Sequence, residues 1–154
     1  MVVFMLKGAA ATLVAEGMEG GRSIETAHPP YLGSSHTSVS GVGVYLHSHQ
    51  LCEPSKSMVS GKVVYTDFSS DFKFQCDWDT MYDHLDNAGA LGIAFMARGK
   101  KPGVNLFKHS FWDACFLCNR KMAAVMMYVG AIDLDAWQRK SDLVLHITPT
   151  HDTT

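Results

Sequence analysis

Two closely spaced cysteines, Cys115 and Cys118, are the residues whose types and spacing best suit chemistry. A Cys-x-x-Cys pair can be a redox centre, half of a zinc site or two structural cysteines. A redox pair normally opens a helix, whose N-terminus lowers the pKa of the first thiol, but this pair lies in a loop-like region before an apolar run. We therefore favour a structural disulfide or buried thiols, with a thiol-redox or zinc-binding centre as the alternative.

A zinc site would need two more ligands, and His47 and His49 are the natural candidates, with His109 another. On a strand, a His-x-His segment places both imidazoles on one face. The sequence has no second Cys-x-x-Cys, which would have made zinc a strong prediction. We therefore expect two surface histidines and no metal or other cofactor, and keep Cys115, Cys118, His47 and His49 as the alternative metal ligands.

Six aspartates lie within 20 residues, between Asp67 and Asp86. They do not form a calcium loop of the EF-hand type, because Tyr82 stands where glycine is needed and Ala88 where the bidentate glutamate is needed. Helical spacing would place Asp79, Asp83 and Asp86 on one face. Like charges at this spacing predict a solvated face, with a basic partner or a cation as the alternative.

Motifs of hydrolytic or phosphate chemistry are missing from the sequence. It has no Gly-x-Ser-x-Gly elbow, no His-Glu-x-x-His and no phosphate-cradling glycine loop. A formal net charge of -2 gives no basic excess for nucleic acid. No apolar run is long enough to cross a bilayer, so we expect no membrane insertion by this segment. We therefore expect that the protein is not an enzyme. Its length of 154 residues suits a single domain.

The elements that must position these residues follow from apolar runs and their punctuation by Gly, Pro and Asp. A strand, a helix capped by Asp79 and ended by Gly89, and a second strand fit a parallel crossover. Asp133 can cap a second short helix. Together they predict a mixed α/β (α+β) domain, part of it a β-sandwich or open barrel. The predicted strands cover 2–6, 10–15, 42–46 (an edge strand), 61–67, 90–97, 122–128 and 142–148, with a long surface loop over 28–41.

The order of motifs over residues 50–148 resembles the protease-associated (PA) domain family. Cys52-Glu53-Pro54 and Gly61-Lys62-Val63-Val64 match the family's Cys-x-Pro stretch and the start of its next strand. Cys76-Asp77-Trp78 stands at its Cys-x-Phe turn, and the segment Ala88-Gly89-Ala90 matches its helix end. Ala123 replaces the usual proline of a later strand. The usual Arg-Gly pair is replaced by the longer segment Ser69, Ser70, Asp71, Phe72 and Lys73.

The resemblance implies a non-catalytic module that binds a protein or peptide ligand, as part of a larger receptor, sorting protein, ubiquitin ligase or protease. It implies an extracellular or lumenal location and at least one disulfide. We favour Cys52 with Cys76, which flank the strand over 61–67; the competitor joins Cys76 to Cys115 or Cys118. The candidate binding residues are those of the longer segment, Ser69, Ser70, Asp71, Phe72 and Lys73, together with Asp79, Asp83 and Asp86.

Overall fold

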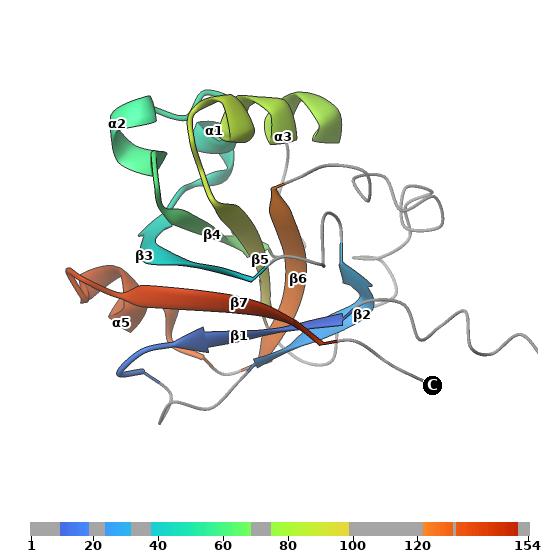
Figure 1. The fold of residues 1–154 in the computed structure, drawn as a ribbon, viewed down its shortest axis with the longest axis vertical. Coiled ribbons are helices and arrows are strands. Elements are labelled where there is room, and N and C mark those ends of the chain that lie inside the picture. The colour runs from blue at the N-terminus through green and yellow to red at the C-terminus, as the bar shows by residue number, and fades with distance from the viewer. Residues whose placement is uncertain are drawn as a thin grey trace, which may run out of the picture.

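In the part of the chain that a computed structural model describes, seven strands form a closed barrel flanked by four short helices (Figure 1). The structure describes residues 10–18, 24–31, 38–68, 75–98, 122–130 and 132–150. The strand expected over 2–6, the segment 69–73 and both Cys115 and Cys118 lie outside this part of the chain. The barrel order is β1-β2-β6-β5-β4-β3-β7. The strands are β1 (Ala10–Ala15), β2 (Ile24–Tyr31), β3 (Val39–Tyr45), β4 (Val63–Phe68), β5 (Gly92–Arg98), β6 (Ala123–Gly130) and β7 (Val144–Thr150).

The strands β3, β4, β5 and β6 pair in parallel, in that order. The other pairs are antiparallel: β1 pairs with β2 and β7, β2 also pairs with β6, and β7 also pairs with β3. The expected crossover is confirmed: β4 and β5 are parallel neighbours on either side of α3 (Trp78–Asn87). The mixed α/β class is also confirmed. The expectation of a sandwich or open barrel is wrong in one respect, because β1 pairs with both β2 and β7 and so closes the ring.

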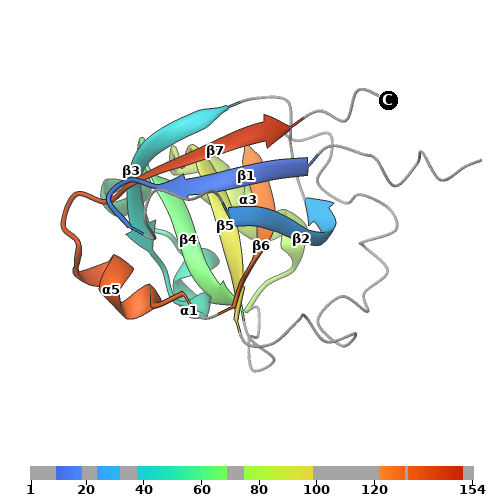
Figure 2. The ribbon, with the colours of Figure 1, turned by 90° about the horizontal axis from the view of Figure 1, so that it is seen from below.

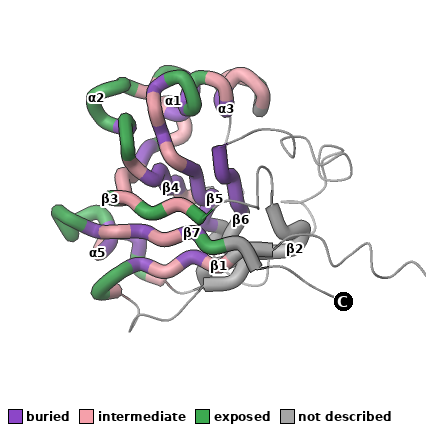
Figure 3. Tube along the Cα trace, in the orientation of Figure 1, coloured by how far each residue is buried: buried purple, intermediate pink, exposed green. Residues whose placement is uncertain are grey.

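Two separate cores follow from the alternation of side chains along β4 and β5. Val64, Ile93 and Phe95 face the helices α1 (Ser48–Leu51), α2 (Lys56–Val59) and α3, which gather on one side of the barrel (Figure 1). Tyr65 and Ala94 face the barrel interior. Strands with both faces covered carry no polar alternation, as expected for β5 and β6. The purple segments in Figure 3 follow these buried stretches.

The helix α3 begins two residues earlier than expected. Asp77, not Asp79, is its N-cap, since the Asp77 carboxylate accepts a hydrogen bond of 3.0 Å from the Thr80 N–H. Hydrogen bonds from the side chain and then the backbone of Thr80 lower the pKa of Asp77. Gly89 follows the helix with φ of 91°, a left-handed conformation that favours glycine, as predicted. The helix buries an apolar stripe: Met81, Tyr82, Leu85 and Ala88.

Two expectations for the first half of the chain are wrong. The predicted surface loop over 28–41 contains the end of β2 and the start of β3. Pro29 and Pro30 fit into β2 because they lie in the irregular stretch between its paired residues Thr26 and Tyr31. The strand expected over 42–46 is not an edge, because β3 pairs with both β4 and β7. Gly43 allows this, since a Cβ there would lie 2.9 Å from a Leu145 methyl carbon.

Candidate functional site

A pocket of about 380 Å³ opens at the point where β3 separates from β7. The two strands pair as far as Val42 and Val144, and a hydrogen bond of 2.7 Å from the Gly43 N–H to the Leu143 carbonyl ends their contact. Beyond it β3 leads into α1, while β7 is preceded by α5 (Leu134–Arg139) (Figure 2). The lining residues come from β3, the start of α1, β4, α5 and the two residues after α5: Gly43, Val44, Tyr45, His47, Gln50, Tyr65, Trp137, Gln138, Lys140 and Ser141.

A series of aromatic rings forms the floor of the pocket. The ring centroids of Trp137 and Tyr65 lie 5.5 Å apart, those of Tyr65 and Tyr45 5.5 Å, and those of Tyr45 and His47 4.9 Å, all edge to face. His47 then stacks on His49 with centroids 5.7 Å apart and planes 6° from parallel. Edge-to-face contacts are a favoured geometry for aromatic pairs. The floor therefore joins β3, β4, α1 and α5 through packed rings.

Tyr65 and Trp137 belong to the barrel core as well as to the pocket. Each side chain is only 1% exposed, and both pack in the interior cluster with Leu134 and Leu145. The pocket is therefore the mouth of the barrel at the end that α5 covers, a common position for ligand sites. Burial, with a smaller effect of the neighbouring Tyr45, raises the pKa of the Tyr65 phenol above its ordinary value.

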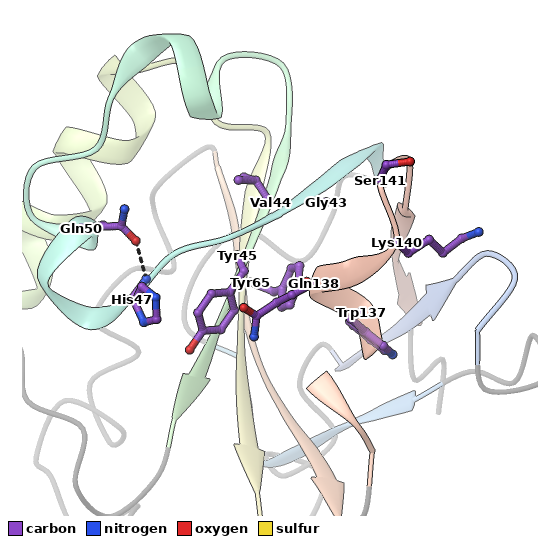
Figure 4. A pocket seen from close by; sticks show the side chains of 10 residues that line it. All are labelled: Gly43, Val44, Tyr45, His47, Gln50, Tyr65, Trp137, Gln138, Lys140 and Ser141. Atoms are coloured by element: carbon purple, nitrogen blue, oxygen red, sulfur yellow. Dashed lines mark hydrogen bonds between the residues drawn. The ribbon is translucent and has the colours of Figure 1, made fainter. Parts of the chain in front are cut away.

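The polar rim carries amide, hydroxyl, imidazole and ammonium groups, and no carboxylate is among the lining residues. Figure 4 shows Gln50 and His47 on one side, Lys140 and Ser141 on the other, and Gln138 between them. The His47 backbone N–H donates to the Gln50 side-chain oxygen at 2.8 Å. This bond fixes the amide so that the Gln50 NH₂ group is left to donate to a ligand.

The N-cap of α5 positions the residues that this helix contributes to the pocket rim. The Asp133 carboxylate accepts hydrogen bonds from the Asp135 and Ala136 N–H groups at 3.0 and 3.2 Å, as its predicted N-cap role requires. The helix then buries Leu134 and Trp137 and leaves Gln138 exposed. The N-cap Asp133, the buried Trp137 and the pocket residue Gln138 thus lie close together in the sequence.

A second cluster links a serine, a histidine and a glutamate across three neighbouring segments. Ser40 on β3 lies opposite His146 on β7, with its Oγ 2.6 Å from Nδ1, and the other ring nitrogen of His146 contacts the Glu16 carboxylate. The order of groups resembles that of a hydrolytic triad. Hydrolysis also needs donors for the developing oxyanion and a cleft for the substrate, and none of the three residues lines the pocket. The cluster lies on an exposed face and ties β1, β7 and β3 together.

The predicted disulfide is confirmed. Cys52 and Cys76 are bonded, with their Cα atoms 6.0 Å apart. The competing pairing of Cys76 with Cys115 or Cys118 is therefore wrong, because the Cys76 sulfur is already used. The bridge joins the end of α1 to the segment before α3, and His84 on α3 also hydrogen-bonds the Cys52 carbonyl.

The structure separates the other sequence-predicted site residues. Asp79, Asp83 and Asp86 lie on the part of α3 opposite its apolar stripe, two of them half-buried and Asp86 exposed, and none lines the pocket. His47 and His49 are exposed, as expected of surface histidines, and His47 precedes α1 while His49 lies within it. In the described part of the chain, no three His, Cys, Asp or Glu side chains are grouped to hold a metal ion. Among the same residues no helix is long and apolar enough to cross a membrane.

Most of the pocket was missed at the sequence level. His47 was singled out, but Tyr45, Gln50, Tyr65 and Gln138 were not. A signal was available, because β3 and β4 both carry Val-Tyr at corresponding positions, and Tyr45 pairs with Tyr65 in the parallel register. A recurring aromatic at the end of two predicted strands indicates a shared face.

Comparison with known proteins identifies the fold alone. No protein-family model matches the sequence, and no curated protein matches it. A zinc aminopeptidase from Bacillus subtilis is similar in structure, with a TM-score of 0.51 and 9% identity over 94% of this chain and 31% of that one. The subtilisin-like protease Apa1 from the Antarctic psychrotroph Pseudoalteromonas sp. AS-11 matches less closely, with a TM-score of 0.46 and 11% identity over 95% of this chain and 34% of that one. The chain therefore spans about a third of the length of these solved structures, and it shares its fold with part of the larger aminopeptidase chain.

Proposed function

We propose that this chain is a non-catalytic binding module of the protease-associated type, which holds part of a protein or peptide ligand in the pocket at the barrel mouth. The observation that carries the proposal is the pocket itself. It combines a rigid aromatic floor, ending at the buried Tyr65 and Trp137, with polar groups from α1 and α5. Such a concave site with a few convergent polar groups is typical of binding sites.

The resemblance to PA domains supports the type of module. The Cys52 and Cys76 motifs that carried the resemblance are joined in a disulfide, and the Gly61 and Ala88-Gly89-Ala90 motifs lead into β4 and β5. The fold also occurs as 31% of a larger aminopeptidase chain, which fits a module that serves a longer protein. The disulfide favours an extracellular or lumenal location, where such bonds persist.

Selection of displayed random peptides on the immobilised domain tests the proposal. Gln138→Trp should fill the pocket, because Gln138 is exposed on α5 and lines it. Arg139→Trp is the matched control: it adds the same bulk to the next residue, which is exposed but does not line the pocket. We expect the selected peptides to lose binding to Gln138→Trp and to keep it for Arg139→Trp.

The acidic face of α3 is the competing surface. A variant with Asp79, Asp83 and Asp86 all changed to Asn should bind the selected peptides as the wild type does, because these residues lie outside the pocket. Peptides that bind Gln138→Trp normally but fail on this triple variant would overturn the assignment of the pocket and favour the helix face.

A further inference from the structure

We propose that the pocket at the barrel mouth binds an uncharged aromatic side chain of the peptide ligand, which lies against the rings of Tyr45 and His47. The proposal rests on the proposed function and names the residue type that the ligand presents. Three features of the pocket support it: the rings that a ligand can reach, the charges that face the ligand, and the size of the pocket.

Two of the four packed rings are accessible to a ligand. Tyr65 and Trp137 are each 1% exposed and are held in the barrel core. Tyr45 is half-buried and His47 is exposed, and both line the pocket. Each ring packs edge to face on the next, so the core supports the two accessible rings from behind. Because aromatic rings favour such contacts with one another, a ligand ring on Tyr45 extends the series.

No carboxylate, ammonium or guanidinium group of the described residues is directed into the pocket. Its ten lining residues include no Asp or Glu. The one lysine among them, Lys140, has its Nζ beside Gly17, where a Cβ built on the glycine would be 3.5 Å away. In Figure 4, Lys140 points away from Gln50 and Gln138. A charged ligand side chain would lose water here without gaining a counter-charge, so the pocket favours an uncharged one.

The rim and the volume suit a single large residue and its main chain. The Gln50 oxygen accepts from the His47 N–H, so its NH₂ group is left to donate to a peptide carbonyl. Gln138 is exposed and offers a second amide. The volume of about 380 Å³ lies near the lower end of the range for ligand pockets, roughly 300–1,000 Å³. One aromatic side chain therefore fits this space better than a longer segment does.

NMR titration of the labelled domain with short blocked peptides tests the proposal. The probes are acetyl-Gly-Phe-Gly-amide, its non-aromatic counterpart acetyl-Gly-Leu-Gly-amide, and two charged peptides with Glu or Arg at the same place. We expect the phenylalanine peptide to bind about fivefold more tightly than each of the others. Its ring current should shift the signals of the Tyr45 ring and of the Gln138 side-chain amide.

Variants of the two accessible rings provide the second arm. Tyr45→Leu removes the ring and keeps an apolar side chain, so it should lose the preference for the phenylalanine peptide, whereas Tyr45→Phe should keep it. His47→Ala should weaken binding of this peptide. His49→Ala is the matched control, because His49 is also exposed but does not line the pocket. The exposed His47 pair of variants decides the test if Tyr45→Leu fails to fold.

Several outcomes would overturn the proposal while leaving a binding pocket in place. These are equal binding of the phenylalanine and leucine peptides, an unchanged preference in folded Tyr45→Leu, and tighter binding of either charged peptide. Tighter binding of the arginine peptide would mean that the rings take a cation. Pocket-dependent peptides from the random library that lack Phe, Tyr and Trp would also overturn it. Only library peptides insensitive to Gln138→Trp would reject the binding pocket itself.

Discussion

Cys52 and Cys76 are bonded across the two ends of the segment that carries α2 and β4, and His84 on α3 hydrogen-bonds the carbonyl of the same Cys52. The start of α3 and its last turn are thus both tied to the end of α1. Since α1 carries Gln50, this pair of links also holds one side of the pocket rim.

Removing the disulfide should therefore destabilise the fold. The bond closes a loop between residues 24 apart in sequence, and a loop of this size corresponds to about 3 kcal/mol of unfolding free energy. We expect the double variant Cys52→Ala/Cys76→Ala to lose about this much in urea unfolding. A wild-type protein treated with a reductant should behave like the variant.

Peptide mapping and metal analysis decide the state of the other two cysteines, Cys115 and Cys118. Non-reducing peptide mapping should recover a Cys52–Cys76 peptide, and zinc quantitation should find no bound metal, with Cys115 and Cys118 either bridged or free. Four free thiols with one equivalent of zinc would contradict the disulfide and favour a metal site at Cys115 and Cys118.

Leu85 tests the packing of α3 on the sheet. Its side chain is fully buried in the cluster that contains Ile93 and Phe95 of β5. Leu85→Ala should therefore cost about 2–5 kcal/mol of unfolding free energy, from lost burial and the cavity left behind. Asn87→Ala is the matched control, an exposed position on the same helix. An unchanged thermal midpoint for Leu85→Ala would mean that α3 does not pack as described.

Helices and strands with periodic apolar patterns could be predicted from the sequence. The pairing between strands that are far apart in the sequence could not. Leu85, Ile93, Phe95 and Val125 lie in predicted apolar elements and are buried, but Val144 of the predicted strand over 142–148 is only half-buried. Leu143, just before β7, and Leu145 and Ile147 within it fill the barrel interior, so Val144 lies in the other phase of the alternation. Which face of an alternating strand lies inside depends on its neighbours. The pairing of β7 with β1 and β3 cannot be read from the local sequence of β7.

The pocket was hard to predict for the same reason. Its residues come from β3, α1, β4 and the α5 segment, which are far apart in sequence. Closure of the barrel brings these segments together, and closure depends on β1, whose partners β2 and β7 lie at opposite ends of the chain. The disulfide was predictable because both cysteines flank one strand, β4.

Tyr65 should make the protein sensitive to alkaline pH. Burial raises the pKa of its phenol in the folded state above the ordinary value of 10.0, so the unfolded chain loses this proton first. Stability is unaffected below about pH 10 and falls as the pH rises beyond it, because ionisation then favours the unfolded state. Tyr65→Phe should flatten this decline in urea unfolding between pH 9 and about 11. An equally steep decline in Tyr65→Phe would contradict the assignment.

Asp133 connects helix capping to the pocket. Its carboxylate accepts two backbone N–H groups of α5, the helix that carries Trp137 and Gln138. Asp133→Ala should cost about 1 kcal/mol of unfolding free energy and weaken peptide binding, because α5 loses its fixed start. Asp133→Asn is the control, since asparagine is an equally good N-cap. Equal binding by all three proteins would show that the cap does not order the rim.

The Ser40, His146 and Glu16 cluster should be structural and not catalytic. Its three side chains lie on an exposed face outside the pocket, and a hydrogen-bonded pair alone does not stabilise an oxyanion. We expect the purified chain to turn over no peptide, ester or nucleotide, and His146→Ala to change only stability, by at most about 1 kcal/mol. Assays with fluorogenic peptides, p-nitrophenyl acetate and a nucleoside triphosphate check this. A turnover that disappears in Ser40→Ala and His146→Ala, but survives in the pocket variant Gln138→Trp, would contradict the binding-module proposal and make the cluster a hydrolytic site.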